Sequence, residues 1–409
     1  MKVLILAHSA ALGGSGRSMA TVVEQLRIAG CEVVVLTPSG PICAVLENLG
    51  AEVAFWEPPD CQWLGTSVYS SLVSARGLNV LAYRLLSLAK LPVRLMRSVR
   101  MIREIVTHQS ITTIYVNTLV LFPVSGILAS IRQGHHVRVL WQVREVLNKH
   151  LLRIVYSGIA KSIAHASDVI IAISANEARA FESLVPVEII HNTVPIEWAR
   201  MKDRYLCANG DRHRVYMTCD FNSGKGIADF LAMAEIVHER CPQAEFTLYT
   251  PHPRLHQGPT SRILRAVGYW NDKVALLVDF LGNAKELSLR RHVRLIFDYA
   301  MDLESHRQAA VYVRADRAAC PWGRDIIEAM WAGVPVVATG TCQEFVLDGQ
   351  TGFLVPPARP DLLADRVCHL LLNPELRAAM SRASRARALE LFSPDLFNAE
   401  IRRVFSKEK

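Results

Sequence analysis

The stretch that most constrains this chain runs from Val311 to Pro357 and reads VYVRADRAACPWGRDIIEAMWAGVPVVATGTCQEFVLDGQTGFLVPP. It opens with a short β-rich run. A Pro-Trp-Gly turn then leads into Arg324–Trp331, whose apolar residues share one helical face and which ends before Gly333. Val334–Ala338 is a second apolar run typical of a buried strand. Strand, helix and strand in close succession are typical of a parallel α/β sheet.

A loop of small residues, Thr339–Glu344, follows the second of these strands. In open α/β sheets, ligands bind in loops at the carboxyl ends of parallel strands. Backbone N–H groups in such a loop, followed by a helix N-terminus, suit a diphosphate. The sequence therefore predicts an anion-binding edge at this end of the sheet.

The same stretch resembles the nucleotide-sugar half of retaining GT-B glycosyltransferases, most closely glycosyltransferase family 4. That family carries the pattern EPFGxxxLEAMAxGxPVVAT, followed by GGxxE and DGxTGxLV. The first Glu of the pattern falls on Cys320 here, which is a departure. The matching positions are Pro321, Trp322, Gly323, Glu328, Ala329, Met330, Gly333, Pro335, Val336, Val337, Ala338, Thr339, Glu344, Asp348, Gly349, Thr351, Gly352, Leu354 and Val355.

The resemblance implies an α/β chain of the GT-B fold, with two Rossmann-like, doubly wound parallel-sheet domains facing a cleft. The implied domains are an acceptor-side domain at 1–195, a nucleotide-sugar domain at 196–392, and a C-terminal helix at 393–409 that crosses back to the first domain. A chain of 409 residues with 51% hydrophobic residues is long enough for two cores. The polar, aperiodic segment between about 194 and 214 is expected to link the domains.

The chain begins with a strand expected at Val3–Ala7, a glycine loop at His8–Ser18 and a helix at Met19–Ala29. Glycines let a backbone approach a ligand closely, and a helix start favours an anion. A signal peptide is the alternative interpretation of the apolar N-terminus, but the run is short and fits a first strand better. The resemblance places this loop, with Gly14 and Arg17, near the transferred sugar.

Apolar runs separated by helical patterns continue along both halves of the chain, as expected for doubly wound parallel sheets. The strands are expected at 32–36, 52–55, 113–116, 137–141, 168–173, 187–190, 215–219, 245–249 and 293–297. Further helices are expected at 42–49, from 227, and at 303–309, 362–372, 375–391 and 396–405. Residues 258–289 are irregular and are not assigned.

Gln142 stands at the end of a strand where the resembling family often has a His near the reactive end of the sugar. Glutamine cannot take a proton, but it can hydrogen-bond a hydroxyl group. Asn192 lies in a segment that resembles the family's hinge. Arg144 and Glu145 form either a local ion pair or a pair of cleft residues, and the sequence favours neither.

Lys225 lies in a glycine-containing turn, Asp220–Gly226, before a helix. In the resembling family this turn carries an Arg and a Lys, five residues apart, that grip the donor diphosphate. Lys225 matches the Lys, whereas Asp220 stands in place of the Arg. A lysine at such a turn is a strong anion site, and the alternative is a solvated turn lysine.

The site predicted from these residues combines an electrostatic clamp with a carboxylate. Glu328 is expected to bind the ribose, because two adjacent hydroxyls suit one bidentate carboxylate. Neither a cofactor nor a metal is expected, since no Asp-x-Asp motif stands in a suitable loop. The predicted catalytic residues are Glu328, Lys225 and Gln142. The predicted donor-binding residues are Gly14, Arg17, Asn192, Lys225, Cys320, Trp322, Gly323, Arg324, Glu328, Gly340, Thr341 and Glu344.

The resemblance implies a retaining glycosyltransferase that moves a sugar from a nucleoside-diphosphate sugar to a glycan or lipid-linked acceptor, as in polysaccharide or glycoconjugate synthesis. The alternative is a catalytically weakened GT-B protein that acts as a binding or partner subunit. The departures at Cys320, Asp220 and Gln142 favour that alternative. Another GT-B enzyme, such as a phosphorylase or a sugar epimerase, is a third reading.

Residues 67–108 form a long helical region with seven basic residues and one acidic residue, Glu104. Such a region is either a pair of surface helices with a solvated face or a basic surface that rests on anionic lipid. The basic residues are Arg76, Arg84, Lys90, Arg94, Arg97, Arg100 and Arg103.

Charge and cysteine usage bear on the compartment. The net charge is +8, which favours anionic membranes or anionic substrates, and no nucleic-acid partner is expected. Nine dispersed cysteines without metal-ligand spacing indicate free thiols in a reducing compartment. No run of 18 apolar residues is present. We therefore expect a cytoplasmic protein, peripheral at the inner face of the membrane.

Overall fold

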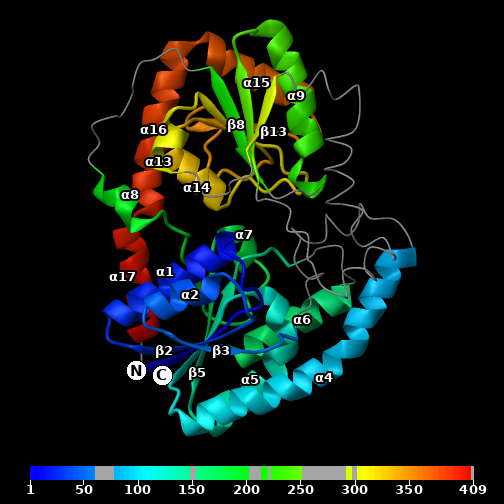
Figure 1. The fold of residues 1–409 in the computed structure, drawn as a ribbon, viewed down its shortest axis with the longest axis vertical. Helices are drawn as coiled ribbons and strands as arrows, with labels where there is room; N and C mark the ends of the chain where they lie inside the picture. The colour runs from blue at the N-terminus through cyan, green and yellow to red at the C-terminus, as the bar shows by residue number, and fades with distance from the viewer. Residues whose placement is uncertain are drawn as a thin grey trace. The chain divides into compact units, whose positions relative to one another are not determined.

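The computed structural model describes residues 1–59, 78–147, 153–201, 213–219, 223–250, 292–296 and 302–406 (Figure 1). The chain divides into two compact units. The first contains Met1–Tyr69, Ala82–Asn192 and Asp395–Lys409, and the second contains Ser70–Leu81 and Thr193–Pro394. The first unit therefore takes its residues from both ends of the sequence.

The first unit is built on a seven-stranded sheet with the order β3-β2-β1-β4-β5-β6-β7, and all its pairings are parallel. Its central strands are almost wholly buried, which explains why they read as continuous apolar runs. The strands are β1 (Lys2–Leu6), β2 (Glu32–Thr37), β3 (Glu52–Phe55), β4 (Thr113–Val116), β5 (Arg138–Val143), β6 (Val169–Ala172) and β7 (Val187–Ile189).

The first helix, α1 (Gly14–Ile28), begins five residues before the predicted start at Met19. The reason is steric, because a Cβ at Gly16 would collide with the Ala11 carbonyl oxygen. Glycine therefore lets the first turn pack where the sequence predicts a loop. The other helices before the second unit are α2 (Ile42–Asn48), α4 (Leu78–His108), α5 (Ser125–Gly134), α6 (Arg153–Ala166) and α7 (Ala175–Ala178), with a 3-10 helix at Leu119–Val124.

The basic region is one continuous helix, α4, from Leu78 onward, and not a pair of helices within that range. Ser98, Ile102 and Val106 of this helix are buried, and the last two belong to the apolar core on one face of the sheet. Residues 67–77 lie outside the described residues. Of the helices that the structure describes, none combines the length and apolar character needed to cross a bilayer.

The last helix, α17 (Pro394–Ser406), completes the core of the first unit. Phe397, Ile401 and Val404 belong to the same buried cluster as Val3 and Ile5. The Nη1 group of Arg138 on β5 donates to the Val404 carbonyl oxygen at 2.5 Å. The C-terminal helix therefore returns to the first domain, as predicted.

The second unit holds a six-stranded parallel sheet with the order β10-β9-β8-β11-β12-β13. Two parallel α/β sheets confirm the predicted fold class. The strands are β8 (Arg214–Thr218), β9 (Glu245–Tyr249), β10 (Val293–Ile296), β11 (Val311–Arg314), β12 (Val336–Thr339) and β13 (Gly352–Val355). The helices are α8 (Ile196–Arg200), α9 (Ile227–Arg240), α13 (Leu303–Arg307), α14 (Arg324–Trp331), α15 (Pro360–Leu372) and α16 (Pro374–Phe392).

Two segments discussed above fall largely outside the described residues. They are 202–212 of the expected linker and all of 258–289. Asp220, which stands in place of the family's Arg, also lies outside them.

Candidate active site

The turn that carries Lys225 is pressed against the neighbouring strand. Ser223–Lys225 is a short 3-10 turn after β8, and Gly226 caps α9 with a φ of +74°. A Cβ at Gly226 would collide with the Ala315 carbonyl oxygen just beyond β11. Only glycine tolerates both this backbone conformation and this close approach. The turn is therefore held against the carboxyl end of β11.

This approach places Lys225 on Asp316, two residues beyond the end of β11. The Lys225 Nζ lies 3.1 Å from Asp316 Oδ2, and Arg314 Nη2 lies 3.2 Å from the same oxygen. The Ala318 amide donates to Asp316 Oδ1 at 2.8 Å. Burial alone would raise the pKa of the Asp316 carboxyl, but the two cations and the amide outweigh it and hold that pKa below 3.8.

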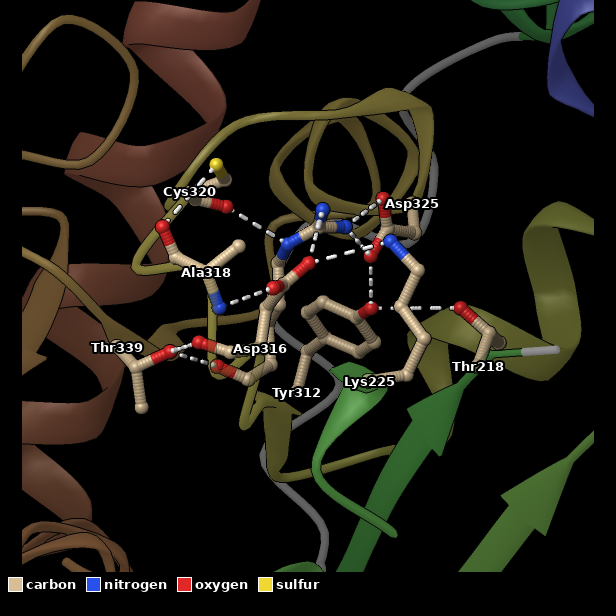
Figure 2. A network of polar contacts seen from close by, with 9 residues as sticks. Thr218, Lys225, Tyr312, Asp316, Ala318, Cys320, Asp325 and Thr339 are labelled. Atoms are coloured by element: carbon tan, nitrogen blue, oxygen red, sulfur yellow. Dashed lines mark hydrogen bonds and ion pairs between the residues drawn. The ribbon is translucent and has the colours of Figure 1, made fainter. Parts of the chain in front are cut away.

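Arg314 extends the network to α14. Its Nη1 donates to Asp325 Oδ1 at 2.6 Å, and its Nε donates to the Cys320 carbonyl oxygen at 2.9 Å. The Tyr312 hydroxyl also donates to Asp325, and burial followed by the Asp325 charge raises the Tyr312 pKa well above 10. Figure 2 shows Lys225, Tyr312, Asp316 and Asp325 pointing toward one another in this network.

The network pairs two cations, Lys225 and Arg314, with two carboxylates, Asp316 and Asp325. The Asp316 side chain is 5% exposed, whereas that of Lys225 is 24% exposed. The buried Asp316 carboxylate therefore fixes the Lys225 ammonium, while part of the Lys225 side chain stays open to solvent.

The helix α14 holds the predicted ribose ligand. Glu328 Oε1 lies 2.9 Å from Arg324 Nε, one helical turn earlier, and both side chains are under 10% exposed. The ion pair fixes the direction of the carboxylate. If Glu328 binds a ribose, it does so with one oxygen already shared with Arg324.

The predicted residues on either side of α14 are packed together. Gly323 caps α14 with a φ of +148°, and a Cβ there would meet Asp325 Oδ1 at 2.6 Å and Arg314 Nη1 at 2.9 Å. A Cβ at Gly340, which has a φ of +130°, would meet Pro321 Cδ at 2.6 Å. The structure therefore brings the loops of Cys320 and Gly340 together at the carboxyl ends of β11 and β12.

The remaining predicted donor residues differ in exposure. Trp322 is buried, at 9% exposure, and Cys320 is half-buried, with its Sγ donating to the Ala318 carbonyl oxygen at 3.4 Å. Thr341 is exposed at the start of the loop after β12. Glu344 is half-buried, and Arg387 of α16 donates to its carbonyl oxygen at 2.5 Å.

In the first unit, the structure gathers Gln142 and Asn192 around Arg144. Arg144 Nη2 donates to Gln142 Oε1 at 2.5 Å, and its Nη1 donates to Asn192 Oδ1 at 3.1 Å. Glu145 instead accepts from the Thr118 hydroxyl at 3.1 Å. The interpretation of Arg144 and Glu145 as a local ion pair is therefore wrong.

The other two predicted residues of the first unit lie at the start of α1. Gly14 is its first residue, and a Cβ there would meet nothing within 4 Å. Arg17 lies in the first turn, and its carbonyl oxygen accepts from the Thr21 hydroxyl at 3.1 Å. Packing within the chain requires glycine at position 16, not at position 14.

Sequence reasoning missed Asp316, Arg314, Asp325 and Tyr312. One signal was available, because Arg314 and Asp316 are charged residues at the end of a buried strand, where sheets of this kind place ligands. In the part of the chain that the structure describes, no three His, Cys, Asp or Glu side chains form a group that could hold a metal ion. The expectation that neither a metal nor a cofactor is used stays a prediction.

Two family models match this chain. A model described as glycosyl transferases group 1 matches residues 279–387, and one described as Glycosyltransferase Family 4 matches residues 12–198. A phosphatidyl-myo-inositol mannosyltransferase of Mycobacterium leprae is 32% identical over 143 residues, which cover 33% of this chain and 38% of that protein. The alignment thus spans little more than a third of that relative.

Solved structures resemble the whole chain. HepE of Anabaena, in complex with UDP and glucose, has a TM-score of 0.68 and 17% identity, with 99% of each chain covered. Sucrose-phosphate synthase of Thermosynechococcus elongatus has a TM-score of 0.68 and 16% identity, covering 99% of this chain and 98% of that one. At these identities the likeness establishes the fold.

The chain has two parallel sheets and a last helix that returns to the first unit, and its lysine turn is linked through Asp316 and Arg314 to the start of α14. These features define a GT-B protein. Within that class, the two family matches make the assignment specific. The chain is a GT-B glycosyltransferase that resembles the group 1, or family 4, enzymes.

Proposed function

We propose that the protein is a retaining glycosyltransferase that uses a nucleoside-diphosphate sugar and transfers the sugar to a glycan or lipid-linked acceptor. The observation that carries the proposal is the position of the Lys225 ammonium. It lies 3.1 Å from Asp316 Oδ2, beyond the carboxyl ends of β8 and β11. The HepE structures, one in complex with UDP and glucose and another with UDP-glucose, support a UDP-sugar as the first donor to test.

In this proposal Lys225 binds the diphosphate and stabilises the negative charge that grows on it as the sugar leaves. The loop that starts at Gly340 adds backbone N–H groups. A reaction of this kind depends on positioning and electrostatic stabilisation more than on a general base. This requirement fits Gln142, which can hydrogen-bond a hydroxyl group but cannot take a proton.

Glu328 is the proposed ribose ligand. Its carboxylate is held by Arg324 and has little freedom to rotate away. A preoriented acceptor loses less conformational entropy on binding than a mobile one. The nucleoside and the diphosphate would then be bound by α14 and by the Lys225 turn, which belong to the same unit.

The proposed acceptor lies at a membrane, and α4 supports this. Its outward face exposes Arg97, Arg100 and Arg103 together with Val93 and Met96, which are 47% and 65% exposed. Basic side chains beside exposed apolar ones are typical of helices that lie on anionic lipid. The protein would act in the cytoplasm at the inner face of the membrane, and the match to a mannosyltransferase named for a phosphatidylinositol substrate supports a lipid-linked acceptor.

Donor hydrolysis by the purified protein tests the proposal. We expect slow release of UDP from one of several UDP- or GDP-sugars, and loss of that release in Lys225→Ala. A thermal-shift screen with the same sugars reports binding separately, since a ligand of the folded state raises stability as its concentration exceeds Kd. Binding without any turnover would favour the alternative, a partner subunit with a retained donor site.

A further inference from the structure

Arg144 is the charged centre of a cluster at the carboxyl ends of β4 and β5. Its Nε and Nη2 groups donate to Asn117 Oδ1 at 3.2 and 3.0 Å. The bonds to Gln142 and Asn192 described above complete the set, and Nε also reaches the Asn117 carbonyl oxygen at 3.3 Å. Every one of these acceptors is an uncharged amide oxygen. The cluster therefore orients the guanidinium without neutralising it.

The neighbours that could supply a negative charge do not supply it as an ion pair. Glu145 is turned to the Thr118 hydroxyl and to the Leu119 amide, at 3.1 and 3.4 Å, and acts on Arg144 only from a distance. The Tyr115 hydroxyl donates to Gln142, and burial raises the pKa of Tyr115 to about 12, so the phenol stays neutral near pH 7. Among the described residues, Arg144 has no carboxylate within ion-pair distance.

A half-buried guanidinium without a counter-ion is unfavourable, and burial lowers the pKa of Arg144. By contrast, Arg132 in the same unit lies 3.2 Å from Asp168, and Arg403 lies 2.8 Å from Glu188. One Nη1 hydrogen of Arg144 has no acceptor among the described residues, since Asn192 takes the other. The planar group is therefore fixed in place with a donor to spare, in a form suited to a carboxylate or a phosphate.

We propose that Arg144 binds an oxyanion, either a phosphate or a carboxylate, carried by the acceptor. This rests on the proposed function, which assigns the donor diphosphate to Lys225 in the second unit. Arg144 lies in the first unit and donates a hydrogen bond to Gln142, the residue expected near the reactive end of the sugar. An anionic group on the acceptor would neutralise the Arg144 guanidinium, which the amide oxygens of the cluster do not. It would also set the acceptor's orientation beside Gln142.

The test uses the full chain and small probes. The melting temperature is titrated with glycerol phosphate, with glucuronate, and with glycerol and glucose as neutral controls. UDP is titrated in parallel as a probe of the second unit. The variants are Arg144→Gln and Arg144→Lys, with Arg132→Gln as the matched control, because Arg132 is a half-buried arginine of the same unit that has its counter-ion.

We expect one of the two anions to stabilise the wild type and Arg132→Gln, with no effect of the neutral probes. The better anion identifies whether the acceptor carries a phosphate or a carboxylate. Arg144→Gln is expected to raise the apparent Kd at least tenfold. Arg144→Lys keeps the charge but loses the planar fork, and we expect it to raise Kd three- to tenfold.

Two results would overturn the proposal. One is an absence of any anion effect on the wild type, and the other is wild-type anion affinity in either folded Arg144 variant. If Arg144→Gln does not fold, Arg144→Lys decides the question. The UDP shift should be unchanged throughout, so its absence in every protein would contradict the donor assignment and not the anion site.

Discussion

The Nζ atom of Lys225 lies 3.1 Å from Oδ2 of Asp316, although the two residues are 91 positions apart in the chain. The contact joins the turn after β8 to the residues that follow β11, and β8 and β11 are neighbours in the sheet. The carboxylate is shared with Arg314, so Asp316 fixes two cations at once. The position of the Lys225 ammonium is therefore set by the pairing of two strands as well as by its own turn.

Lys225→Ala is expected to lower turnover about a hundredfold or more, since removing one donor that stabilises a developing anion costs about 3 kcal/mol. Lys225→Arg keeps the charge beside Asp316 and should retain most of the activity. Initial rates with a saturating UDP-sugar measure the difference. Equal activity in the two variants would remove Lys225 from the diphosphate site.

Asp316→Asn is expected to destabilise the protein at neutral pH by about 3–5 kcal/mol, because it leaves buried cations without their partner. The pKa of Asp316 lies below 3.8 in the folded state, so its contribution is complete above the unfolded value near 3.8 and is lost as pH falls through the folded pKa. The gap between wild type and variant should therefore narrow below about pH 4.

Urea unfolding between pH 2 and 7 measures this gap. Asp361→Asn is the matched control, because Asp361 forms an exposed pair with Arg359 and its pKa is also lowered, to about 2. Its effect at neutral pH should be smaller, since solvent screens an exposed pair. A gap that stays constant down to pH 2 would contradict the charge assignment for Asp316.

Glu328→Gln is expected to weaken donor binding by about 1.5–3 kcal/mol, the usual contribution of a hydrogen bond to a charged group. The exposed Glu375→Gln is the control and should leave donor affinity unchanged. Calorimetric titration with UDP measures Kd. The unfolding curve is recorded alongside, because the change also removes the Arg324 ion pair. Unchanged affinity in a folded variant would rule out the ribose role.

Gly226→Ala is expected to destabilise the second unit by more than Gly349→Ala. Both glycines have a φ of +74°, so both changes carry the backbone cost of about 1–2 kcal/mol. A Cβ at Gly349 meets nothing within 4 Å, whereas one at Gly226 collides with Ala315. Chemical unfolding of the two variants isolates that collision. Equal losses would show that the turn can move away from β11.

The outward face of α4 is expected to bind anionic vesicles. Each basic residue near an anionic surface contributes about 1 kcal/mol, so changing Arg97, Arg100 and Arg103 to Gln should weaken binding by about a hundredfold. Raising the salt should also weaken it, because the attraction is screened within about 8 Å at physiological ionic strength. Co-sedimentation with neutral and anionic liposomes provides the measurement.

The control for the vesicle experiment removes the same charge elsewhere. Arg240, Arg359 and Arg382 are exposed in the second unit, and changing all three to Gln leaves α4 intact. This control should bind vesicles like the wild type. Equal loss in both triple variants would mean that net charge, and not α4, governs binding. A protein that binds neutral and anionic liposomes equally would contradict the membrane interpretation.

Local pattern was enough to predict the elements that position the candidate donor site. The bounds of α14 and the start of α9 at Ile227 agree with the prediction, because each combines an apolar face with a glycine at its boundary. The predicted start of α1 was wrong, since the close approach of Gly16 to the Ala11 carbonyl oxygen depends on the fold of the preceding loop, which the apolar pattern does not give. The strand β13 was not predicted, because its four residues carry little periodicity of their own.

The charged networks were less accessible to sequence reasoning. Arg314 and Asp325 are 11 residues apart and Lys225 and Asp316 are 91 apart, so no local spacing marks either pair. Sheet register brings them together. Arg144 and Glu145 are adjacent in the sequence, which left both interpretations open. In the structure, Arg144 instead contacts Asn117, just after β4, and Asn192, three residues beyond β7, and Glu145 contacts Thr118.

The return of α17 to the first unit has a consequence for biosynthesis. Phe397, Ile401 and Val404 leave the ribosome only after the entire second unit has been made, yet they cover apolar residues of the first strand. Until then, the nascent first unit exposes a hydrophobic face that belongs to its core. Translation arrested before Pro394 would yield a chain that is ready to aggregate or to engage a chaperone, even with the whole second sheet already synthesised.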